Sequence, residues 1–248
     1  METECWVFVS GFTQDGNAWN PVRRPLQRML GYDETGLGAA PPDADSFVDA
    51  AAQLAGLRAF HRDAQRLSHT TFVGYSQGGR LCLQLALDRP EVTDKLVLVS
   101  ASPGIADPTE RAARVEADER LAQEIERDGV DDFIERWLAQ PLFATLPRER
   151  SGIDERTLLN TVEHLTYQLR VLGQGAQPSN WDRLGDLRMP VLLLAGELDT
   201  KYVDIARRMA EQIPDARVEI VPGAGHACHL EQPELVVQLL ASFESDTR

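Results

Sequence analysis

The stretch TTFVGYSQGGRLCLQLAL, residues 70–87, decides the fold of this chain. It begins with an apolar, β-branched run and ends in a helical pattern, with the sequence G-x-S-x-G between them at residues 74–78. Strand, motif and helix in this order form a sharp turn that presents the serine hydroxyl above the edge of a sheet. The glycines remove side chains that would collide where the chain reverses. The helix N-terminus favours a developing anion. We therefore interpret Ser76 as a nucleophile or an equivalent reactive group.

Apolar runs like this one recur along the chain and alternate with helical patterns. The runs cover residues 6–9, 70–74, 95–100, 190–195 and 216–221, and the helical patterns cover about 18–30, 47–66, 77–88, 200–212 and 233–243. Short runs that are apolar on both faces suit a parallel sheet covered by helices. Residues 36–45, rich in Gly, Ala and Pro, indicate a loop. The predicted fold class is α/β, with a mostly parallel central sheet flanked by helices.

One interval carries no convincing strand. Residues 107–181 contain helical stretches at 109–127, 130–138 and 155–172 instead. Ligands of open α/β sheets bind at the carboxyl ends of the strands, where such an insertion would act as a lid. We expect a core formed by residues 1–106 and 182–248 and a helical cap formed by residues 107–181.

The composition restricts the partners of the protein. With 248 residues and 43% hydrophobic content, the chain can bury one substantial core. Its formal charge of -14 argues against nucleic acid or an anionic membrane surface as a partner. An anionic substrate would need local cationic side chains. The acidic start of the chain and the lack of a long apolar run predict a cytoplasmic protein. Without C-x-x-C spacing, Cys5, Cys82 and Cys228 indicate buried reduced thiols and no metal site.

A reactive serine needs a base, and the base needs an acid that orients it. His226 lies in a glycine-rich loop after the run RVEIV, and we rank it ahead of His229, which already approaches the next helix. Asp199 follows another run, although aspartate there could also cap a helix. The chain order Ser76, Asp199, His226 is the one expected of an α/β-hydrolase. The other histidines are interpreted as surface or packing residues: His61, His69 and His164.

Several segments extend this likeness over nearly the whole chain. The sequence resembles the α/β-hydrolase superfamily and, within it, the 2-succinyl-6-hydroxy-2,4-cyclohexadiene-1-carboxylate synthases of menaquinone biosynthesis. The resemblance is carried by GYSQGGR, SPGIADPTERAARVEADERLA, WLAQPLFATL, GQGAQPSNW, GELDTKY and GAGHACHLEQPE. The segments from the cap discriminate most, because many hydrolases share the triad motifs.

The resemblance implies a lyase that expels pyruvate from an enolpyruvyl cyclohexene carboxylate without a metal or cofactor. Ser76 would remove a ring proton, His226 would accept it and Asp199 would hold the imidazole. The backbone N–H groups of Phe12 and Gln77 would form the oxyanion hole. The substrate-binding residues that the resemblance implies are Tyr75, Arg80, Arg114, Trp137 and Lys201. The two arginines suit a substrate with several carboxylates, because a guanidinium group binds a carboxylate through paired hydrogen bonds.

Some assignments stay open at this stage. Arg114 could instead pair with Glu110 on its own helix, and Trp137 could belong to the core of the cap. A later arginine of the family has no clear counterpart among Arg148, Arg150 and Arg156.

Other hypotheses about the function also stay open. Ser10-Gly11 stands where the superfamily usually has His-Gly, which leaves the oxyanion pocket in question. A serine hydrolase of a small acidic ester, thioester or carbon–carbon substrate needs the same triad. A non-catalytic ligand-binding homologue is a further alternative. We expect a monomer or a small homo-oligomer.

Overall fold

The central sheet is formed by strands whose carboxyl ends all meet at one edge. In the computed structural model, which describes residues 3–31, 33–37, 43–57 and 67–247, six strands pair in the order β2-β1-β3-β4-β5-β6, and every pair is parallel. The strands are β1 (Thr3–Val9), β2 (Asp33–Leu37), β3 (Leu67–Tyr75), β4 (Lys95–Val99), β5 (Val191–Gly196) and β6 (Ala216–Val221). The prediction of a mostly parallel sheet is confirmed.

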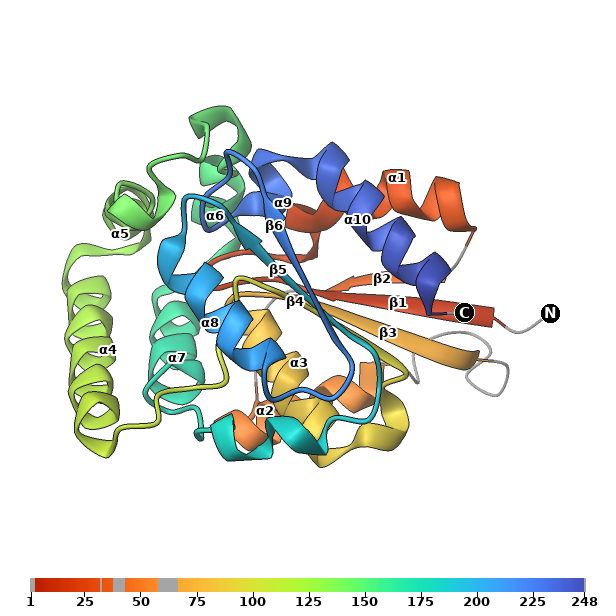
Figure 1. The fold of residues 1–248 in the computed structure, drawn as a ribbon. Coiled ribbons are helices and arrows are strands. Elements are labelled where there is room, and N and C mark those ends of the chain that lie inside the picture. Colours follow the sequence, from red (N-terminus) through yellow and green to blue (C-terminus); the bar gives the residue numbers. More distant parts are fainter. Residues whose placement is uncertain (1–2, 32, 38–42, 58–66, 248) are drawn as a thin grey trace.

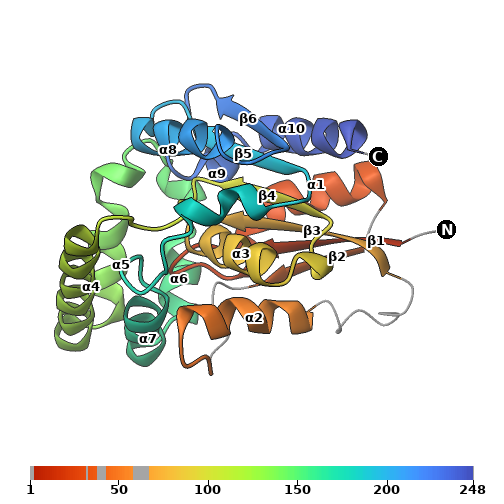
Figure 2. The ribbon, with the colours of Figure 1, turned by 60° about the horizontal axis from the view of Figure 1, so that its bottom comes forward.

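Helices cover both faces of this sheet (Figures 1 and 2). The α-helices are α1 (Asn20–Leu30), α2 (Phe47–Leu57), α3 (Gln77–Asp88), α4 (Pro108–Asp128), α5 (Val130–Leu138), α6 (Ile153–Leu159), α7 (Val162–Leu172), α8 (Thr200–Ala210), α9 (Cys228–Glu231) and α10 (Pro233–Asp246). Short 3-10 helices are η1 (Gly16–Trp19), η3 (Pro90–Val92), η4 (Pro141–Phe143), η5 (Arg148–Arg150) and η6 (Trp181–Asp186).

The alternation of side chains along each strand builds two apolar layers. On β1, Val7 and Val9 pack into the layer that includes α2, α3 and α8. Trp6 and Phe8 point to the opposite layer, which includes α1 and α10. Because both faces are buried, central strands such as β4 and β5 appear as continuous apolar runs rather than as an alternating pattern.

Helices α4 to α7 lie at the left of Figure 1, beyond the carboxyl ends of the strands. They have an apolar cluster of their own, in which Ala122 and Ile125 of α4 and Phe133 of α5 pack with Leu165 and Leu169 of α7. This separate cluster supports residues 107–181 as a cap over the core, a division that we retain as a proposal.

The structure corrects two details of the sequence-based prediction and leaves part of a third outside the described residues. Residues 33–37 form β2, so the loop predicted at 36–45 begins too early, and its residues 38–42 lie outside the described part of the chain. The helix predicted at 47–66 is described as α2 up to Leu57, and residues 58–66, including His61, lie outside the description. The pattern at 155–172 is two helices, because the Thr161 hydroxyl accepts a hydrogen bond from His164 N and caps a new helix.

Two further predictions concern the burial of the cysteines and the presence of membrane-spanning segments. Cys5, Cys82 and Cys228 are buried, as predicted. Burial raises the pKa of the Cys228 thiol to about 12, so this sulfur is held in its protonated form. Among the described helices, none is long and apolar enough to cross a membrane.

Candidate active site

The turn between β3 and α3 holds Ser76 in the geometry that the G-x-S-x-G motif predicts. Ser76 has a φ of 50°, a conformation that costs energy for a residue with a side chain. Its N–H donates to the carbonyl oxygen of Val99 at 2.9 Å, which fixes the turn to the end of β4. A Cβ at Gly78 would collide with the carbonyl oxygens of Val9 and Ser10. The end of β1 therefore requires glycine at position 78, and the end of β4 holds Ser76 in its strained conformation.

Three strand ends bring the predicted triad together. His226, in the loop after β6, places Nε2 3.1 Å from the Ser76 hydroxyl oxygen and Nδ1 2.7 Å from Asp199 Oδ2. The side chains of His226 and Asp199 are buried, and Ser76 is partly exposed. With a proton on Nδ1 donated to the carboxylate, Nε2 is left as an acceptor for the serine hydroxyl. The arrangement can withdraw a proton from the Ser76 oxygen.

Asp199 stands at the N-cap position of α8, but its carboxylate does not cap the helix. The backbone carbonyl of Asp199 accepts the N–H groups of Tyr202 and Val203 instead, each at 3.0 Å. The carboxylate is therefore turned toward the imidazole. Helix α8 positions Asp199 through its backbone, and the Asp199 carboxylate binds His226.

The loop after β1 lies beside the turn that carries Ser76, because Val9 and Gly74 are register partners on β1 and β3. The Ser10 hydroxyl donates to the carbonyl oxygen of Asp15 at 2.6 Å, and Gly11 N donates to Gln14 Oε1 at 3.2 Å. Ser10 thus braces the loop where the superfamily usually has a histidine. Phe12 and Gln77 both line the adjoining cavity, and the role of their N–H groups as an oxyanion hole remains a proposal.

A cavity of about 570 Å³ opens above Ser76 and His226, between the sheet edge and the cap. Its lining includes two carboxylates, Asp118 and Glu124, against the five cationic side chains of Arg80, Arg114, Arg120, Arg156 and Lys201. This surplus of positive charge is concentrated at one place in a chain whose formal net charge is -14. The cavity is therefore suited to an anionic ligand.

Comparison with known proteins agrees with this geometry. The model of the alpha/beta hydrolase family matches residues 6–239. The chain belongs to the alpha/beta hydrolase family. A Bacillus subtilis protein provisionally named 2-succinyl-6-hydroxy-2,4-cyclohexadiene-1-carboxylate synthase is 34% identical, over 97% of this chain and 90% of its own length.

Two further comparisons extend over nearly the whole chain. The 2-succinyl-6-hydroxy-2,4-cyclohexadiene-1-carboxylate synthase of Salmonella typhimurium is 29% identical, over 97% of this chain and 94% of its own length. The structure of MenH from S. aureus superposes with a TM-score of 0.88 at 27% identity, over 100% of this chain and 96% of that one.

In this alpha/beta hydrolase, the predicted cationic residues differ in their burial and in the hydrogen bonds that they already make within the protein. Arg80 is buried and donates to the carbonyl oxygens of Leu172 and Gly173 at the end of α7. Burial lowers the pKa of Arg80 to about 10. Arg80 therefore ties the cap to α3, besides lining the cavity.

Arg114 keeps a partly exposed guanidinium in the cavity. Its Nε donates to Asp118 at 2.8 Å and its Nη1 to Gln174 Oε1 at 2.7 Å. The intrahelical partner is thus Asp118, four residues later, rather than the Glu110 considered from sequence. Asp118 and Gln174 hold the guanidinium toward the cavity without burying it, since 38% of the Arg114 side chain remains exposed.

The aromatic residues of the cavity surround the triad. Tyr75 and Tyr202 pack against His226 with ring centroids at 5.4 and 4.7 Å. Burial raises the pKa of both tyrosines, which keeps their hydroxyls neutral. Trp137 stands edge-on to Phe12, with centroids 5.1 Å apart. It packs against the cap cluster and also lines the cavity, and its contact with substrate stays a prediction.

Arg156 is the residue that sequence reasoning could not single out. Arg148 pairs with Glu135 at the surface, whereas Arg156 is 5% exposed and lines the cavity. Arg156 donates to the carbonyl oxygen of Ser151 at 2.7 Å and to the Thr13 hydroxyl. Burial lowers its pKa to about 10. No periodic signal marks it, because α6 is a single short helix (Ile153–Leu159).

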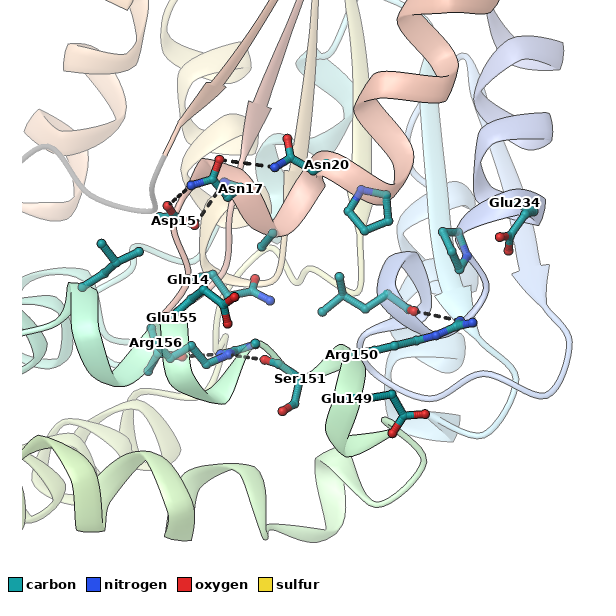
Figure 3. Close-up of a pocket in the computed structure, with 17 residues that line it drawn as sticks. Gln14, Asp15, Asn17, Asn20, Glu149, Arg150, Ser151, Glu155, Arg156 and Glu234 are labelled. Carbon is teal, nitrogen blue, oxygen red and sulfur yellow. Dashed lines mark hydrogen bonds between the residues drawn. The ribbon is translucent and has the colours of Figure 1, made fainter.

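A second cavity, of about 510 Å³, has Thr13, Gln14 and Asp15 of the loop after β1 in its lining (Figure 3). Figure 3 shows Gln14, Glu155 and Arg150 among the residues that line it. Arg156 lines both cavities. Carboxylates outnumber cationic groups in this lining, with Asp15, Glu149, Glu155 and Glu234 against Arg150 and Arg156, so it does not share the positive character of the cavity above Ser76.

His229, the local competitor of His226, is a packing residue. Its ring lies between Trp19 and Tyr75, with centroids at 4.5 and 4.3 Å. Among the described residues, neither ring nitrogen has a hydrogen-bond partner. Burial, with smaller contributions from Arg156 and His226, lowers the pKa of His229 to about 3. His229 is therefore neutral in the folded protein.

This buried imidazole predicts acid sensitivity. The unfolded chain binds a proton at His229 near pH 6.5, but the folded chain does so only near pH 3, so stability is lost as the pH falls between these values. Between pH 7.5 and 4.5 the loss from His229 is about 2 to 3 kcal/mol. We expect His229→Phe to lose less unfolding free energy than the parent protein over this interval. Urea unfolding at both pH values measures it, and equal losses would contradict the account.

Proposed function

We propose that this protein is a 2-succinyl-6-hydroxy-2,4-cyclohexadiene-1-carboxylate synthase that eliminates pyruvate from an enolpyruvyl cyclohexene carboxylate. One observation carries the proposal: the hydrogen-bonded chain from Ser76 through His226 to Asp199 opens into a cavity dominated by cationic side chains. The triad supplies a base, and the cavity suits a substrate that carries several carboxylates. The relatives named above support the same activity.

The triad can take a proton from carbon without forming an acyl intermediate. In the proposed reaction, the Ser76 oxygen removes a ring proton as its own hydroxyl proton passes to His226 Nε2. The electron pair of the broken C–H bond moves through the ring and expels the enolpyruvyl oxygen, so one C–O bond breaks and a conjugated ring remains. The departing enolpyruvate takes up a proton at its methylene carbon and becomes pyruvate, and loss of the proton held by His226 balances this uptake and restores the neutral imidazole.

The protein stabilises the two charges that develop in this step. Negative charge that spreads onto a substrate oxygen would be met by the backbone N–H groups of Phe12 and Gln77. Positive charge on the imidazole is met by the Asp199 carboxylate at 2.7 Å. Arg114, Arg156 and Lys201 would hold the substrate carboxylates, with Arg80 and Tyr75 completing the wall.

Arg114 provides a test of carboxylate binding. We expect Arg114→Ala to raise KM for the enolpyruvyl substrate by about 10- to 100-fold, because a hydrogen bond to a charged group contributes about 1.5 to 3 kcal/mol. The effect on kcat should be much smaller. Steady-state kinetics measures both constants, and Arg111→Ala is the matched control, because Arg111 is exposed on the same helix and does not line the cavity. Unchanged KM in Arg114→Ala would remove this residue from the substrate site.

The activity itself is tested with purified protein and the enolpyruvyl substrate. Pyruvate release is followed by coupling to lactate dehydrogenase. Release that depends on enzyme concentration is expected, and no release at high enzyme concentration would contradict the proposal. A small ester such as p-nitrophenyl acetate, assayed in parallel, tests the rival serine hydrolase. Hydrolysis of the ester without pyruvate release would favour that rival.

A further inference from the structure

Glu231 is a buried carboxylate that binds the backbone on both sides of His226. Its Oε2 accepts the N–H of Gly225 at 2.8 Å, and its Oε1 accepts the N–H of Ala227 at 3.2 Å. The residue is 8% exposed. Both oxygens are thus directed at the loop that carries the imidazole.

The first part of the loop between β6 and α9 is held by other bonds, since Gly223 N donates to Glu197 Oε2 and the Ala224 carbonyl oxygen accepts Leu198 N, each at 2.9 Å. The loop includes Gly223 and Gly225, and glycine permits many backbone conformations. The two amides that Glu231 binds belong to the residues immediately before and after His226. Fixing both restricts the direction in which the His226 side chain leaves the backbone. That direction sets the distance from Nε2 to the Ser76 oxygen.

A carboxylate is the side chain that suits these two amides. It offers two acceptor oxygens and no donor. A glutamine in the same place would keep one acceptor and turn an NH2 group toward the other N–H, which is a repulsive contact. The short helix α9 (Cys228–Glu231) brings Glu231 back to its own loop.

The cap supports the backbone of Glu231 from the other side. Arg150 Nη1 donates to the carbonyl oxygens of Leu230 and Glu231, at 3.3 and 2.9 Å. Figure 3 shows the Arg150 guanidinium at the edge of the second cavity, with one of its hydrogen bonds to a backbone carbonyl drawn as a dashed line. The glutamate is therefore held at its backbone while its carboxylate holds the histidine loop.

We propose that Glu231 is a positioning residue that sets the imidazole of His226 for proton transfer with Ser76. It does not touch substrate, since among the described residues the lining of the cavity above Ser76 includes His226 but not Glu231. The proposal rests on the triad role proposed above. It predicts that removing the charge or one acceptor slows the chemical step and leaves substrate binding intact.

The test compares Glu231→Gln with the parent protein and with Glu197→Gln. Glu197 is a matched control, because it accepts the N–H of Gly223 at 2.9 Å in the same loop but is exposed and does not flank the histidine. We expect Glu231→Gln to lower kcat for pyruvate release by about 10- to 100-fold with KM changed less than twofold, as follows from a small misplacement of a reacting group. Glu197→Gln should retain the parent values.

A second measurement separates this inference from the choice of substrate. A fluorophosphonate labels an activated serine by forming an O–P bond to Ser76 with loss of fluoride, and its rate depends on the triad alone. Labelling of Glu231→Gln should be slowed by the same factor as kcat. Equal labelling of Glu231→Gln and the parent protein would overturn the inference, whereas a labelled parent protein that releases no pyruvate would overturn only the proposed substrate.

Thermal unfolding of each variant shows whether it is folded during the assay. If Glu231→Gln melts below the assay temperature, Arg150→Ala takes its place, because it removes the backbone support from an exposed position and keeps the carboxylate. We expect Arg150→Ala to slow labelling of Ser76 at least threefold. Labelling at the parent rate in that folded variant would overturn the proposal.

Discussion

Ser76→Ala should lower kcat for pyruvate release by about 10³- to 10⁴-fold, the upper part of the range for a positioned acid–base group. The hydroxyl oxygen is the atom that joins His226 Nε2, at 3.1 Å, to the cavity. Without it, the imidazole lies too far back to reach a ring proton directly. Binding should survive, because the cationic groups of the cavity are unchanged, so KM is expected to stay within a fewfold of the parent value.

The matched control for this variant is Ser100→Ala. Ser100 follows the neighbouring strand β4, is buried and has a positive φ of 48°, as Ser76 has 50°, but it does not line the cavity. Ser100→Ala should retain kcat. Thermal unfolding should show that Ser76→Ala is folded. Pyruvate release by Ser76→Ala at the parent rate would refute the assignment of the base.

Asp199→Asn should lower kcat by about 10³- to 10⁴-fold while preserving the shape of the site. An asparagine NH2 facing Nδ1 would donate to it and so place the ring proton on Nε2. His226 would then present a donor to Ser76 and could not accept its proton. The loss of the carboxylate also removes the charge that stabilises the imidazolium. Steady-state kinetics with the enolpyruvyl substrate measures this loss.

Asp204→Asn serves as the control for Asp199→Asn. Asp204 lies about one turn later on α8, is exposed, and does not line the cavity above Ser76. Its substitution should leave kcat unchanged. A kcat for Asp199→Asn within tenfold of the parent protein would show that the carboxylate is not the orienting acid.

The sequence predicts the elements whose burial is uniform and misses those decided by tertiary contacts. Strands such as β4 and β5 are buried at every residue and so appear as unbroken apolar runs. Strand β2, with the sequence DETGL, is polar and contains glycine. Among the described residues it pairs only with β1, at the edge of the sheet. Its extended form is therefore set by β1 rather than by its own residues.

The same distinction applies to the site. Ser76, Asp199 and His226 follow strands and carry local motifs, so the sequence could place them, and the structure brings them within hydrogen-bond distance. Arg156 and Glu231 have no such motif. Their roles depend on contacts with segments far away in the chain or on a return of the chain to its own loop, as in the bonds of Arg156 to Thr13 and of Glu231 to Gly225. Such contacts exist only once the fold has formed.

The most direct test of the central claim is the stoichiometry of one reaction. The purified protein is incubated with the enolpyruvyl cyclohexene carboxylate, and pyruvate and the conjugated cyclohexadiene are quantified together by chromatography. We predict one pyruvate for each cyclohexadiene formed, with both products abolished together in Ser76→Ala. Pyruvate formed without the diene, or unchanged substrate after prolonged incubation with high enzyme concentration, would contradict the account.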